Sequence, residues 1–239
     1  MKKEYEEKGV IVIPDVFSSS ECESIKSAAY STTDEQILAA GYPHLSAIEQ
    51  AYNKKSLLLF PSLANETLNS IRTSKVMVEL VREFIGEDVR QINNQIYFRE
   101  SGDADEFAWH QDIIFREPHI FNDDVEDDYF QTIIAVDDIT EENGAIEFIV
   151  GSHKNMRISK PENLRKFDRG DLKGKKYTAK KGSVLIWSVL IVHGSERNNS
   201  NADRMTYMNG FCRTKAAKTY PHYLIGGEVV SKIDPKMIP

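Results

Sequence analysis

Most apolar positions of the chain fall in short runs that end at glycine, proline, asparagine or aspartate. Apolar runs of this length with such boundaries are typical of β-strands. We expect strands at residues 9–16, 89–99, 130–136, 145–150, 184–187, 190–193 and 205–211. Many short strands joined by turns predict a mainly β fold, a jelly roll or a related barrel-like sandwich.

Two segments instead show the pattern of helices that flank such a fold. Ser20-Glu21-Cys22-Glu23 fits a capping box, so a helix that buries Ile25, Ala28 and Ala29 is expected to follow. Thr73 or Ser74 is expected to cap a second helix, whose apolar stripe ends at Gly86. The residues of that stripe are Val76, Met77, Leu80, Val81 and Phe84.

Length and composition narrow the class of protein. With 239 residues, 41% of them hydrophobic, the chain can bury one core, and we expect a single domain over residues 1–239. The net charge of −7 gives no support for nucleic-acid binding. The apolar run at residues 10–13 is too short for a signal peptide or a membrane span, and the two cysteines, Cys22 and Cys212, suit a reducing compartment. We therefore expect a cytoplasmic protein that does not bind membranes.

The candidate chemistry lies in Trp109-His110-Gln111-Asp112, which is followed by the apolar residues Ile113, Ile114 and Phe115. If this segment is an extended strand, His110 and Asp112 point to the same face and can bind one ion, while Gln111 faces away. His193 ends another apolar run and is the best third ligand. Two histidines and a carboxylate that leave open positions form the site of non-haem iron(II) oxygenases. Taken alone, His-x-Asp also occurs as a surface pair or as a histidine oriented by a carboxylate.

Arg204 adds context, since it follows His193 by eleven residues and starts an alternating stretch. A guanidinium presents a rigid fork of donors that can hold the far carboxylate of a dicarboxylic acid. An isolated arginine at the end of a strand usually lies on the surface, but four elements in this order make coincidence much less probable.

With these motifs, the chain resembles the phytanoyl-CoA dioxygenase family of iron(II)- and 2-oxoglutarate-dependent oxygenases. Further matches are Gly9-Val10-Ile11-Val12-Ile13-Pro14-Asp15-Val16-Phe17, Asn143-Gly144-Ala145, Gly151-Ser152-His153-Lys154 and His193-Gly194-Ser195. The resemblance implies a double-stranded β-helix, the jelly-roll or cupin-like core. It implies that His110, Asp112 and His193 bind iron, and that Arg204 with Ser195 binds the distal carboxylate of 2-oxoglutarate.

The chain departs from the family pattern at the walls of the co-substrate pocket. Some members place a lysine near the end of the strand before the metal motif, where this chain has Arg99 as a stand-in. Gln95 lies on the same strand, and Asn93, Gln95 and Tyr97 share one of its faces. This face either lines the mouth of the pocket or is a solvent-exposed face of the sheet. Others carry a tryptophan on the strand after the motif, where this chain has Thr132 and its neighbours. Gln95 and Thr132 complete the expected co-substrate contacts.

The resemblance implies that the protein takes O2 and 2-oxoglutarate, releases succinate and CO2, and hydroxylates an unactivated C–H bond of a small molecule, such as an amino acid or specialised metabolite. Asp112 argues against halogenation, because related halogenases have a small residue there to admit the halide. Desaturation, cyclisation and epimerisation stay open. The alternatives from other classes are a non-catalytic metal-binding jelly-roll sensor or binding protein, and a zinc hydrolase, which would leave Arg204 without a role.

Two charged segments stand apart from this site. Residues 122–128 hold five acidic side chains, and residues 154–181 are strongly basic. The first could select a cationic substrate and the second could bind a phosphate-bearing group, but clustered like charges usually lie in water. We expect both to be solvated loops. The oligomeric state cannot be read from the sequence.

Overall fold

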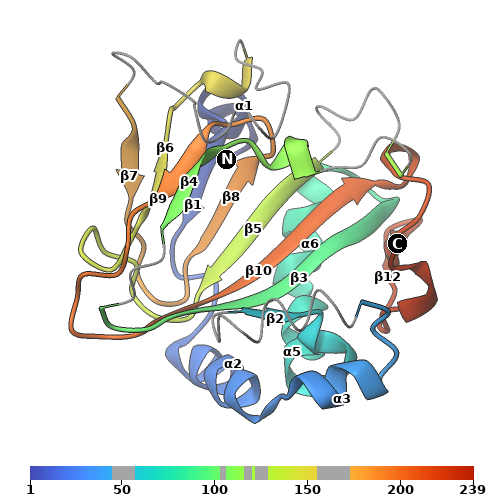
Figure 1. Cartoon of the computed structure of the whole chain (residues 1–239). Helices are drawn as coiled ribbons and strands as arrows, with labels where there is room; N and C mark the ends of the chain where they lie inside the picture. The colour runs from blue at the N-terminus through green and yellow to red at the C-terminus, as the bar shows by residue number, and fades with distance from the viewer. Residues whose placement is uncertain (45–56, 103–105, 116–119, 122–128, 155–172) are drawn as a thin grey trace.

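The computed structural model describes residues 1–44, 57–102, 106–115, 120–121, 129–154 and 173–239. Two antiparallel sheets form its centre (Figure 1). In the larger sheet the strand order is β1 (Val10–Ile13), β8 (Val184–Ser188), β5 (Tyr129–Ala135), β10 (Arg204–Arg213), β3 (Val89–Arg99), β11 (His222–Ile225) and β12 (Glu228–Val229). A short strand, β2 (Leu57–Leu59), also pairs with β3.

The smaller sheet carries the two histidines of the sequence motifs. Its order is β4 (Phe107–His110), β9 (His193–Ser195), β6 (Ile146–Phe148) and β7 (Lys175–Tyr177). One apolar cluster combines side chains of both sheets, among them Ile133, Trp187 and Met208 of the larger sheet and Phe148 of the smaller. The two sheets therefore pack face to face as a β-sandwich.

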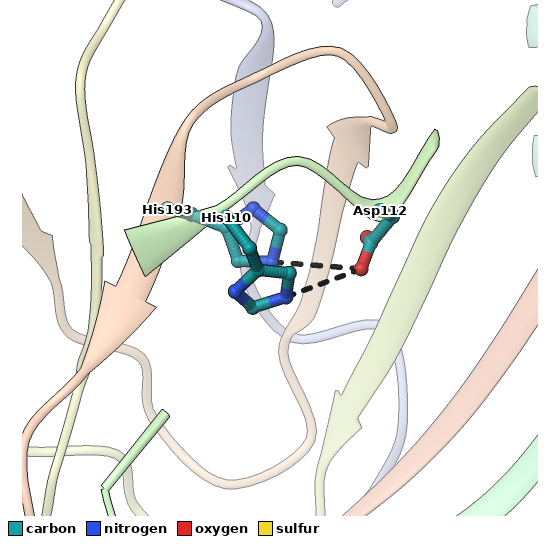
Figure 2. Close-up of side chains that lie close together, drawn as sticks. All are labelled: His110, Asp112 and His193. Atoms are coloured by element: carbon teal, nitrogen blue, oxygen red, sulfur yellow. Dashed lines mark ion pairs between the residues drawn. The ribbon is translucent and has the colours of Figure 1, made fainter. Parts of the chain in front are cut away.

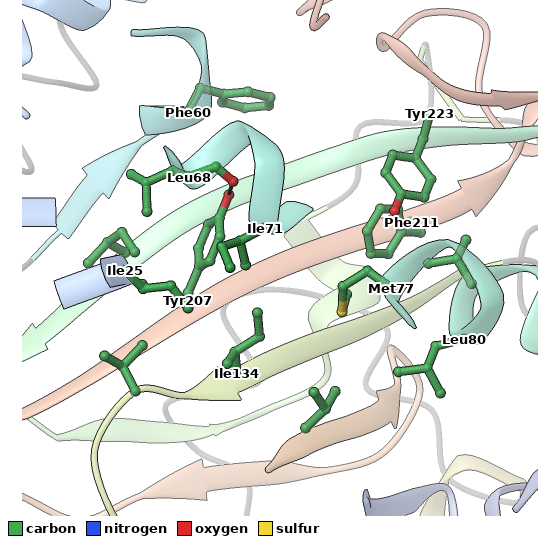
Figure 3. Close-up of a cluster of buried hydrophobic side chains, with 14 of the residues drawn as sticks. Ile25, Phe60, Leu68, Ile71, Met77, Leu80, Ile134, Tyr207, Phe211 and Tyr223 are labelled. Atoms are coloured by element: carbon green, nitrogen blue, oxygen red, sulfur yellow. Dashed lines mark hydrogen bonds between the residues drawn. The ribbon is translucent and has the colours of Figure 1, made fainter. Parts of the chain in front are cut away.

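Helices cover the other face of the larger sheet (Figures 1 and 3). These are α2 (Ser19–Ser31), α5 (Glu66–Arg72) and α6 (Lys75–Phe84). Their Ile25, Leu68 and Met77 pack with Tyr207 and Phe211 of β10 in the largest apolar cluster. Side chains of a strand alternate between its faces, so the odd-numbered positions of β10 face the helices and Arg204, Thr206 and Met208 face the smaller sheet.

The remaining elements are short. They are α1 (Lys2–Lys8), α3 (Asp34–Ala39) and the 3-10 turns Pro61–Leu63, Asp112–Phe115, Ser152–Lys154, Thr214–Ala216 and Pro235–Met237. In the described part of the chain, no helix is long and apolar enough to cross a membrane.

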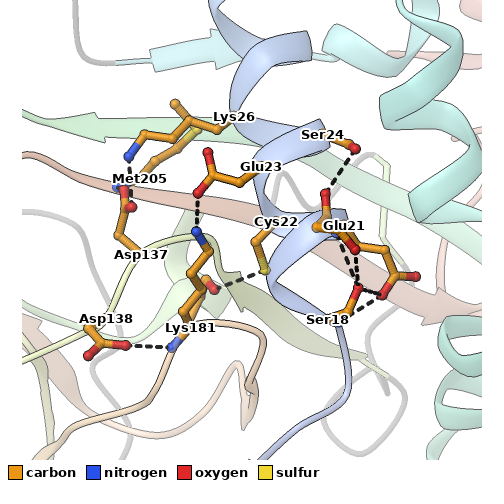
Figure 4. Close-up of polar contacts among 12 residues, drawn as sticks. Ser18, Glu21, Cys22, Glu23, Ser24, Lys26, Asp137, Asp138, Lys181 and Met205 are labelled. Atoms are coloured by element: carbon orange, nitrogen blue, oxygen red, sulfur yellow. Dashed lines mark hydrogen bonds and ion pairs between the residues drawn. The ribbon is translucent and has the colours of Figure 1, made fainter.

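The start of α2 differs from the prediction. The cap is Ser18, whose hydroxyl accepts from the amide of Glu21 at 3.2 Å, while the Glu21 carboxylate accepts from the Ser18 amide at 2.7 Å (Figure 4). A capping box needs the acid three residues after the cap, so Glu21 selects Ser18 and the predicted start at Ser20 is wrong. Ile25, Ala28 and Ala29 are buried as expected.

Ion pairs fasten α2 to the loops at one end of the larger sheet (Figure 4). Lys26 Nζ lies 2.7 Å from one carboxylate oxygen of Asp137, and the other oxygen accepts from the Met205 amide at 3.0 Å. Lys181 pairs with Glu23. These contacts hold the start of β10 (Arg204–Arg213), where Arg204 lies, against α2.

All but one of the predicted strands are present, most of them with shifted ends. The predicted strand at 89–99 has the predicted bounds. The first strand covers Val10–Ile13, not residues 9–16, because Gly9 has φ +79° and Asp15 φ +55°, neither of which is extended. The prediction of a strand at 190–193 is wrong: residues 189–190 lie in a turn that is closed by the hydrogen bond from the Ile191 amide to the Ser188 carbonyl, and the strand begins at His193.

The second predicted helix is α6. Its cap residue is Ser74, although the Ser74 side chain makes no capping hydrogen bond, and its helical residues end at Phe84, two before Gly86. Met77, Leu80, Val81 and Phe84 are buried, as the stripe predicted, whereas Val76 is only partly buried at the edge of the cluster.

A polar network lies within the helix-covered face. Arg72 at the end of α5 is fully buried, and its guanidinium donates to Gln91 Oε1 at 2.8 Å and to Asn69 Oδ1. Gln91 in turn donates to Asn209 Oδ1 at 2.7 Å. The guanidinium also donates to the Ser231 carbonyl, which ties the C-terminal segment to α5. Burial of this charge depends on these partners.

Candidate functional site

His110 and His193 are cross-strand partners. In the pairing of β4 with β9, His110 lies opposite His193, and their ring centroids are 4.2 Å apart. Directly opposed residues of antiparallel strands place their side chains next to each other on the same face. Two histidines that are 83 residues apart in the sequence thus meet because the smaller sheet pairs in this register.

Both imidazoles are held in the same tautomer. His110 Nδ1 lies 2.7 Å from the Ala108 carbonyl, and His193 Nδ1 lies 3.0 Å from the Ile191 carbonyl. A carbonyl can only accept, so each Nδ1 carries a proton, and in the neutral imidazole Nε2 is the nitrogen left to bind a metal. Orientation of this kind by a backbone carbonyl is usual for histidines that bind metals through Nε2.

Asp112 completes the cluster from a turn. The prediction of an extended strand through Phe115 is wrong: β4 ends at His110, and Asp112–Phe115 form a 3-10 turn. The turn forms because the buried Gln111 side chain donates to the Leu190 carbonyl and the Ile113 amide donates to the Val189 carbonyl. Phe115 is therefore 59% exposed, yet Asp112 still faces His110.

The three side chains fit a metal ion (Figure 2). Asp112 Oδ1 lies 3.4 Å from His110 Nε2 and 3.8 Å from His193 Nε2. An ion about 2.1 Å from each ligand atom places neighbouring ligand atoms roughly 3 to 4 Å apart. Three protein ligands would leave further coordination positions open, as in a two-histidine, one-carboxylate iron site.

The protonation states also suit a metal. Burial and the neighbouring charge of His110 lower the pKa of His193 to about 4. Burial alone would lower the pKa of His110, but the hydrogen bond and charge of Asp112 outweigh it and raise that pKa. Burial would raise the pKa of Asp112, but the charge of His193 and the hydrogen bonds from His110 and Trp187 lower it well below its usual range. The carboxylate and the His193 imidazole are thus in their metal-binding forms at neutral pH.

A cavity of about 90 Å³ adjoins these ligands. It lies between the sheets and is lined by Tyr97, Arg99, Phe107, His110, Asp112, Ile133, Ile146, Trp187, His193, Gly194, Ser195, Arg204, Thr206 and Met208. Since a water needs on the order of 10–15 Å³ by this measure, the cavity has room for several waters or one small organic acid.

Two arginines meet in this cavity because Arg204 at the start of β10 pairs with Arg99 at the end of β3. Arg204 is 5% exposed, and its Nε and Nη1 have no hydrogen-bond partner among the described residues. Burial and the charge of Arg99 lower the pKa of Arg204, but a guanidinium still stays protonated at neutral pH. A buried cation with unused donors is a site for an anion.

Arg99 is held in place by its neighbours. It donates to the Ser195 hydroxyl at 2.9 Å and to the Glu196 carbonyl, and its guanidinium carbon lies 5.2 Å from the centroid of the Phe107 ring. Phe107 is the cross-strand partner of Ser195, which explains why the three side chains meet. The structure thus places Arg99, Ser195 and Arg204 in the same cavity as the metal-binding cluster.

Gln95 and Thr132 are not among the residues that line the cavity. Gln95 shares a strand face with Tyr97 and accepts a hydrogen bond from its hydroxyl at 3.0 Å, so it contacts a residue of the cavity lining. Thr132 is fully buried and donates to the Asn209 carbonyl. Its neighbour Ile133 faces the cavity, so Thr132 points to the helix-covered side, and alternation along the strand excludes direct contact with a ligand in the cavity.

Several lining residues were not predicted. Thr206 and Met208 follow Arg204 at intervals of two, so strand alternation was the signal that could have placed them with it. Trp187 was predicted only as part of a strand, and its indole Nε1 donates to Asp112 Oδ2 at 2.9 Å. Nothing in its local sequence indicates that contact. The acidic residues 122–128 and residues 155–172 of the basic segment lie outside the described residues.

Comparisons with known proteins agree with this geometry. The chain is 27% identical over 231 residues, 90% of its length and 78% of the relative, to a probable alpha-ketoglutarate-dependent hypophosphite dioxygenase of Stutzerimonas stutzeri. The nickel complex of the non-haem monooxygenase ThoJ has a similar fold, with a TM-score of 0.71 at 14% identity over 100% of this chain and 88% of that one.

A second solved structure shares the fold. The non-haem alpha-ketoglutarate-dependent carbocyclase SnoK from nogalamycin biosynthesis gives a TM-score of 0.69 at 20% identity, over 91% of this chain and 84% of that one. The two-sheet architecture is thus the jelly roll of the iron- and 2-oxoglutarate-dependent oxygenases, as the sequence predicted. The family model for phytanoyl-CoA dioxygenase (PhyH) matches residues 5–206, so the chain belongs to the phytanoyl-CoA dioxygenase family.

Proposed function

We propose that this enzyme, a member of an iron(II)- and 2-oxoglutarate-dependent oxygenase family, hydroxylates an unactivated C–H bond of a small molecule. His110, Asp112 and His193 would hold the iron, and Arg204 with Ser195 would hold the distal carboxylate of 2-oxoglutarate. One observation carries the proposal: a single cavity is lined both by a three-ligand cluster with open positions and by a buried arginine with unused donors.

Iron, 2-oxoglutarate and O2 supply the oxidising chemistry, in which 2-oxoglutarate becomes succinate and CO2 and the second oxygen atom of O2 enters the substrate. The chain supplies position. Arg204 meets an incoming carboxylate at a buried position, where a charge-assisted hydrogen bond is strong. Ser195 already accepts from Arg99, which leaves its own hydroxyl proton for the same carboxylate. The apolar walls Ile133, Ile146 and Met208 limit the entry of water.

The related proteins leave the outcome of the oxidation open. SnoK is a carbocyclase, and the relative from Stutzerimonas stutzeri is named for hypophosphite, a small anion without carbon. We favour hydroxylation over halogenation, because Asp112 occupies the position that a halide would need. The substrate that we propose is an amino acid or specialised metabolite. Hypophosphite belongs in the substrate screen because two buried arginines line the cavity.

The decisive experiment is an anaerobic titration of metal-stripped protein with iron(II) and 2-oxoglutarate, followed by the visible metal-to-ligand charge-transfer band of the chelate. We expect the band with the wild-type protein and its loss in His110→Ala, Asp112→Ala and His193→Ala. Arg204→Ala should need about 10- to 150-fold more 2-oxoglutarate, since a hydrogen bond to a charge contributes about 1.5–3 kcal/mol. Arg197→Ala, which removes an exposed arginine nearby, is the matched control.

The outcomes separate the candidate functions. A band followed by succinate release with an added substrate supports the oxygenase, and the product then identifies the reaction. Iron binding without a band would favour the metal-binding sensor or binding protein. A ligand variant that keeps full succinate production would contradict the assigned site.

A further inference from the structure

Trp187 reaches the metal-binding cluster from the opposite sheet. It lies in β8 of the larger sheet and is 1% exposed. Its indole Nε1 donates to Asp112 Oδ2 at 2.9 Å, across the interface between the two sheets. A buried tryptophan usually finds a partner for its N–H, but here the partner is a carboxylate that faces two imidazoles.

The two oxygens of Asp112 have different surroundings. Oδ1 is the oxygen that approaches both imidazoles, at 3.4 Å from His110 Nε2 and 3.8 Å from His193 Nε2, and Figure 2 shows both ion pairs meeting at this atom. Oδ2 accepts the indole proton. A carboxylate can bind a metal through one oxygen or through both, and only the first mode leaves three further positions around a six-coordinate ion with this ligand set.

We propose that Trp187 is a positioning residue that keeps Asp112 a one-oxygen metal ligand. The proposal rests on the function proposed above, in which three open positions are needed for the two oxygens of 2-oxoglutarate and for O2. The indole N–H engages Oδ2 and directs Oδ1 to the metal. Without it, Asp112 is free to rotate or to bind through both oxygens, and either change weakens the site for metal or for 2-oxoglutarate.

The ring of Trp187 also packs within the same cluster, so packing and hydrogen bonding must be separated. Its centroid lies 5.8 Å from that of His193 and 5.9 Å from that of Phe148, and Phe148 stacks on His193 at 5.5 Å. Trp187→Phe removes the N–H and keeps an aromatic ring. Phe148→Leu is the matched control, because it removes an aromatic contact with His193 and leaves the indole donor in place.

The test measures binding by the full-length protein without turnover. We compare the metal-stripped wild type with Trp187→Phe and Phe148→Leu. An anaerobic titration with cobalt(II) measures the metal affinity of each protein. A separate anaerobic titration with iron(II) and 2-oxoglutarate, in which the charge-transfer band is recorded, measures the affinity for 2-oxoglutarate. Loss of a hydrogen-bond partner of a metal ligand typically lowers metal affinity about 10- to 100-fold. We expect a loss in that range, or an equal loss of 2-oxoglutarate affinity, for Trp187→Phe, and a change under about threefold for Phe148→Leu.

A purely structural role for Trp187 predicts a different result. Trp187→Phe would then lower the thermal midpoint while both affinities stay at the wild-type values, or both variants would lose affinity equally. Either result overturns the proposal. If instead the wild-type protein binds no iron or forms no band, the proposed function fails first, so the two failures are distinguishable.

A measurement on the wild-type chain keeps the test open if Trp187→Phe does not fold. The chain has two tryptophans, so a proton–nitrogen correlation spectrum shows two indole signals, which Trp109→Phe assigns. We expect the Trp187 indole proton to exchange with solvent more slowly than that of Trp109 and its signal to shift on addition of zinc(II). Fast exchange and no shift on saturation with zinc would overturn the proposal.

Discussion

Arg99 donates a hydrogen bond to the Ser195 hydroxyl at 2.9 Å. Arg99 ends β3 of the larger sheet and Ser195 ends β9 of the smaller sheet, so the bond joins the two sheets. Because that hydroxyl oxygen accepts from a cation, its own proton becomes a better donor. Ser195 and Arg204 line the same cavity, so this proton and the Arg204 guanidinium are available to one carboxylate. We infer that Arg99 would act on a bound co-substrate through Ser195.

The first prediction tests this relay by a double-mutant cycle. Ser195→Ala should weaken 2-oxoglutarate binding by about 2- to 12-fold, the effect of one hydrogen bond of about 0.5–1.5 kcal/mol. Arg99→Met should weaken it at least as much, and the double variant should lose less than the product of the single losses. Isothermal titration of the metal-loaded protein measures each affinity. If the losses of binding free energy in the two single variants add up to the loss in the double variant, Arg99 acts independently of Ser195.

The second prediction concerns pH. Metal binding needs neutral imidazoles and an ionised Asp112, so protons compete with the metal. Asp112 stays ionised and His193, with a pKa of about 4, stays neutral through the mildly acidic range, so His110, whose pKa is raised, is the group that takes up a proton first. Cobalt(II) affinity should therefore be constant at high pH and fall about tenfold per pH unit below the pKa of His110. Equal affinities at pH 8 and pH 5.5 would contradict this order of protonation.

The third prediction concerns Gly144, which packs against Arg99. Gly144 has φ +81°, and an added Cβ would lie 2.6 Å from the Glu196 carbonyl oxygen and 2.8 Å from Arg99 Nη1. Gly144→Ala should lower the free energy of unfolding by about 2–4 kcal/mol, from left-handed backbone strain plus overpacking, and should also weaken 2-oxoglutarate binding. Gly102→Ala is the control, since Gly102 has φ +73° and an added Cβ would meet nothing within 4 Å.

Urea unfolding of the two glycine variants gives both free energies. The control should lose only the backbone part, about 1–2 kcal/mol, and should bind 2-oxoglutarate as the wild type does. If the two variants lose the same free energy and bind alike, the contact between Gly144 and Arg99 has no role in placing the guanidinium.

The fourth prediction addresses stability away from the cavity. Arg72→Met removes a fully buried guanidinium and leaves Asn69 and Gln91 without their donor, so the free energy of unfolding should fall by more than about 2 kcal/mol. Arg82→Ala breaks an exposed ion pair with Glu87 and should cost less than about 1 kcal/mol. Chemical denaturation measures both, and a loss of equal size in both variants would show that the buried network contributes no more than a surface pair.

The sequence by itself determined the type of fold and the chemistry of the cluster. Apolar runs bounded by turn residues predicted the strands of the larger sheet, and the stripe of α6 predicted its buried face, because both patterns report which side of an element avoids water. His110, Asp112, His193 and Arg204 could be named as candidates because their types and order match what iron and a dicarboxylate need. That residues 1–239 form a single domain stays a prediction.

Only the tertiary structure decided how these residues meet. Register places His110 opposite His193 and Arg99 opposite Arg204, and no local pattern encodes a pairing between strands so far apart in the sequence. The turn at Asp112 forms because Gln111 binds a backbone carbonyl of a distant loop, so a rule based on strand alternation could not predict it. For the same reason the sequence could not exclude Gln95 and Thr132 from the residues that line the cavity. It also did not show that Trp187 contacts Asp112, because a contact across two packed sheets depends on their relative placement.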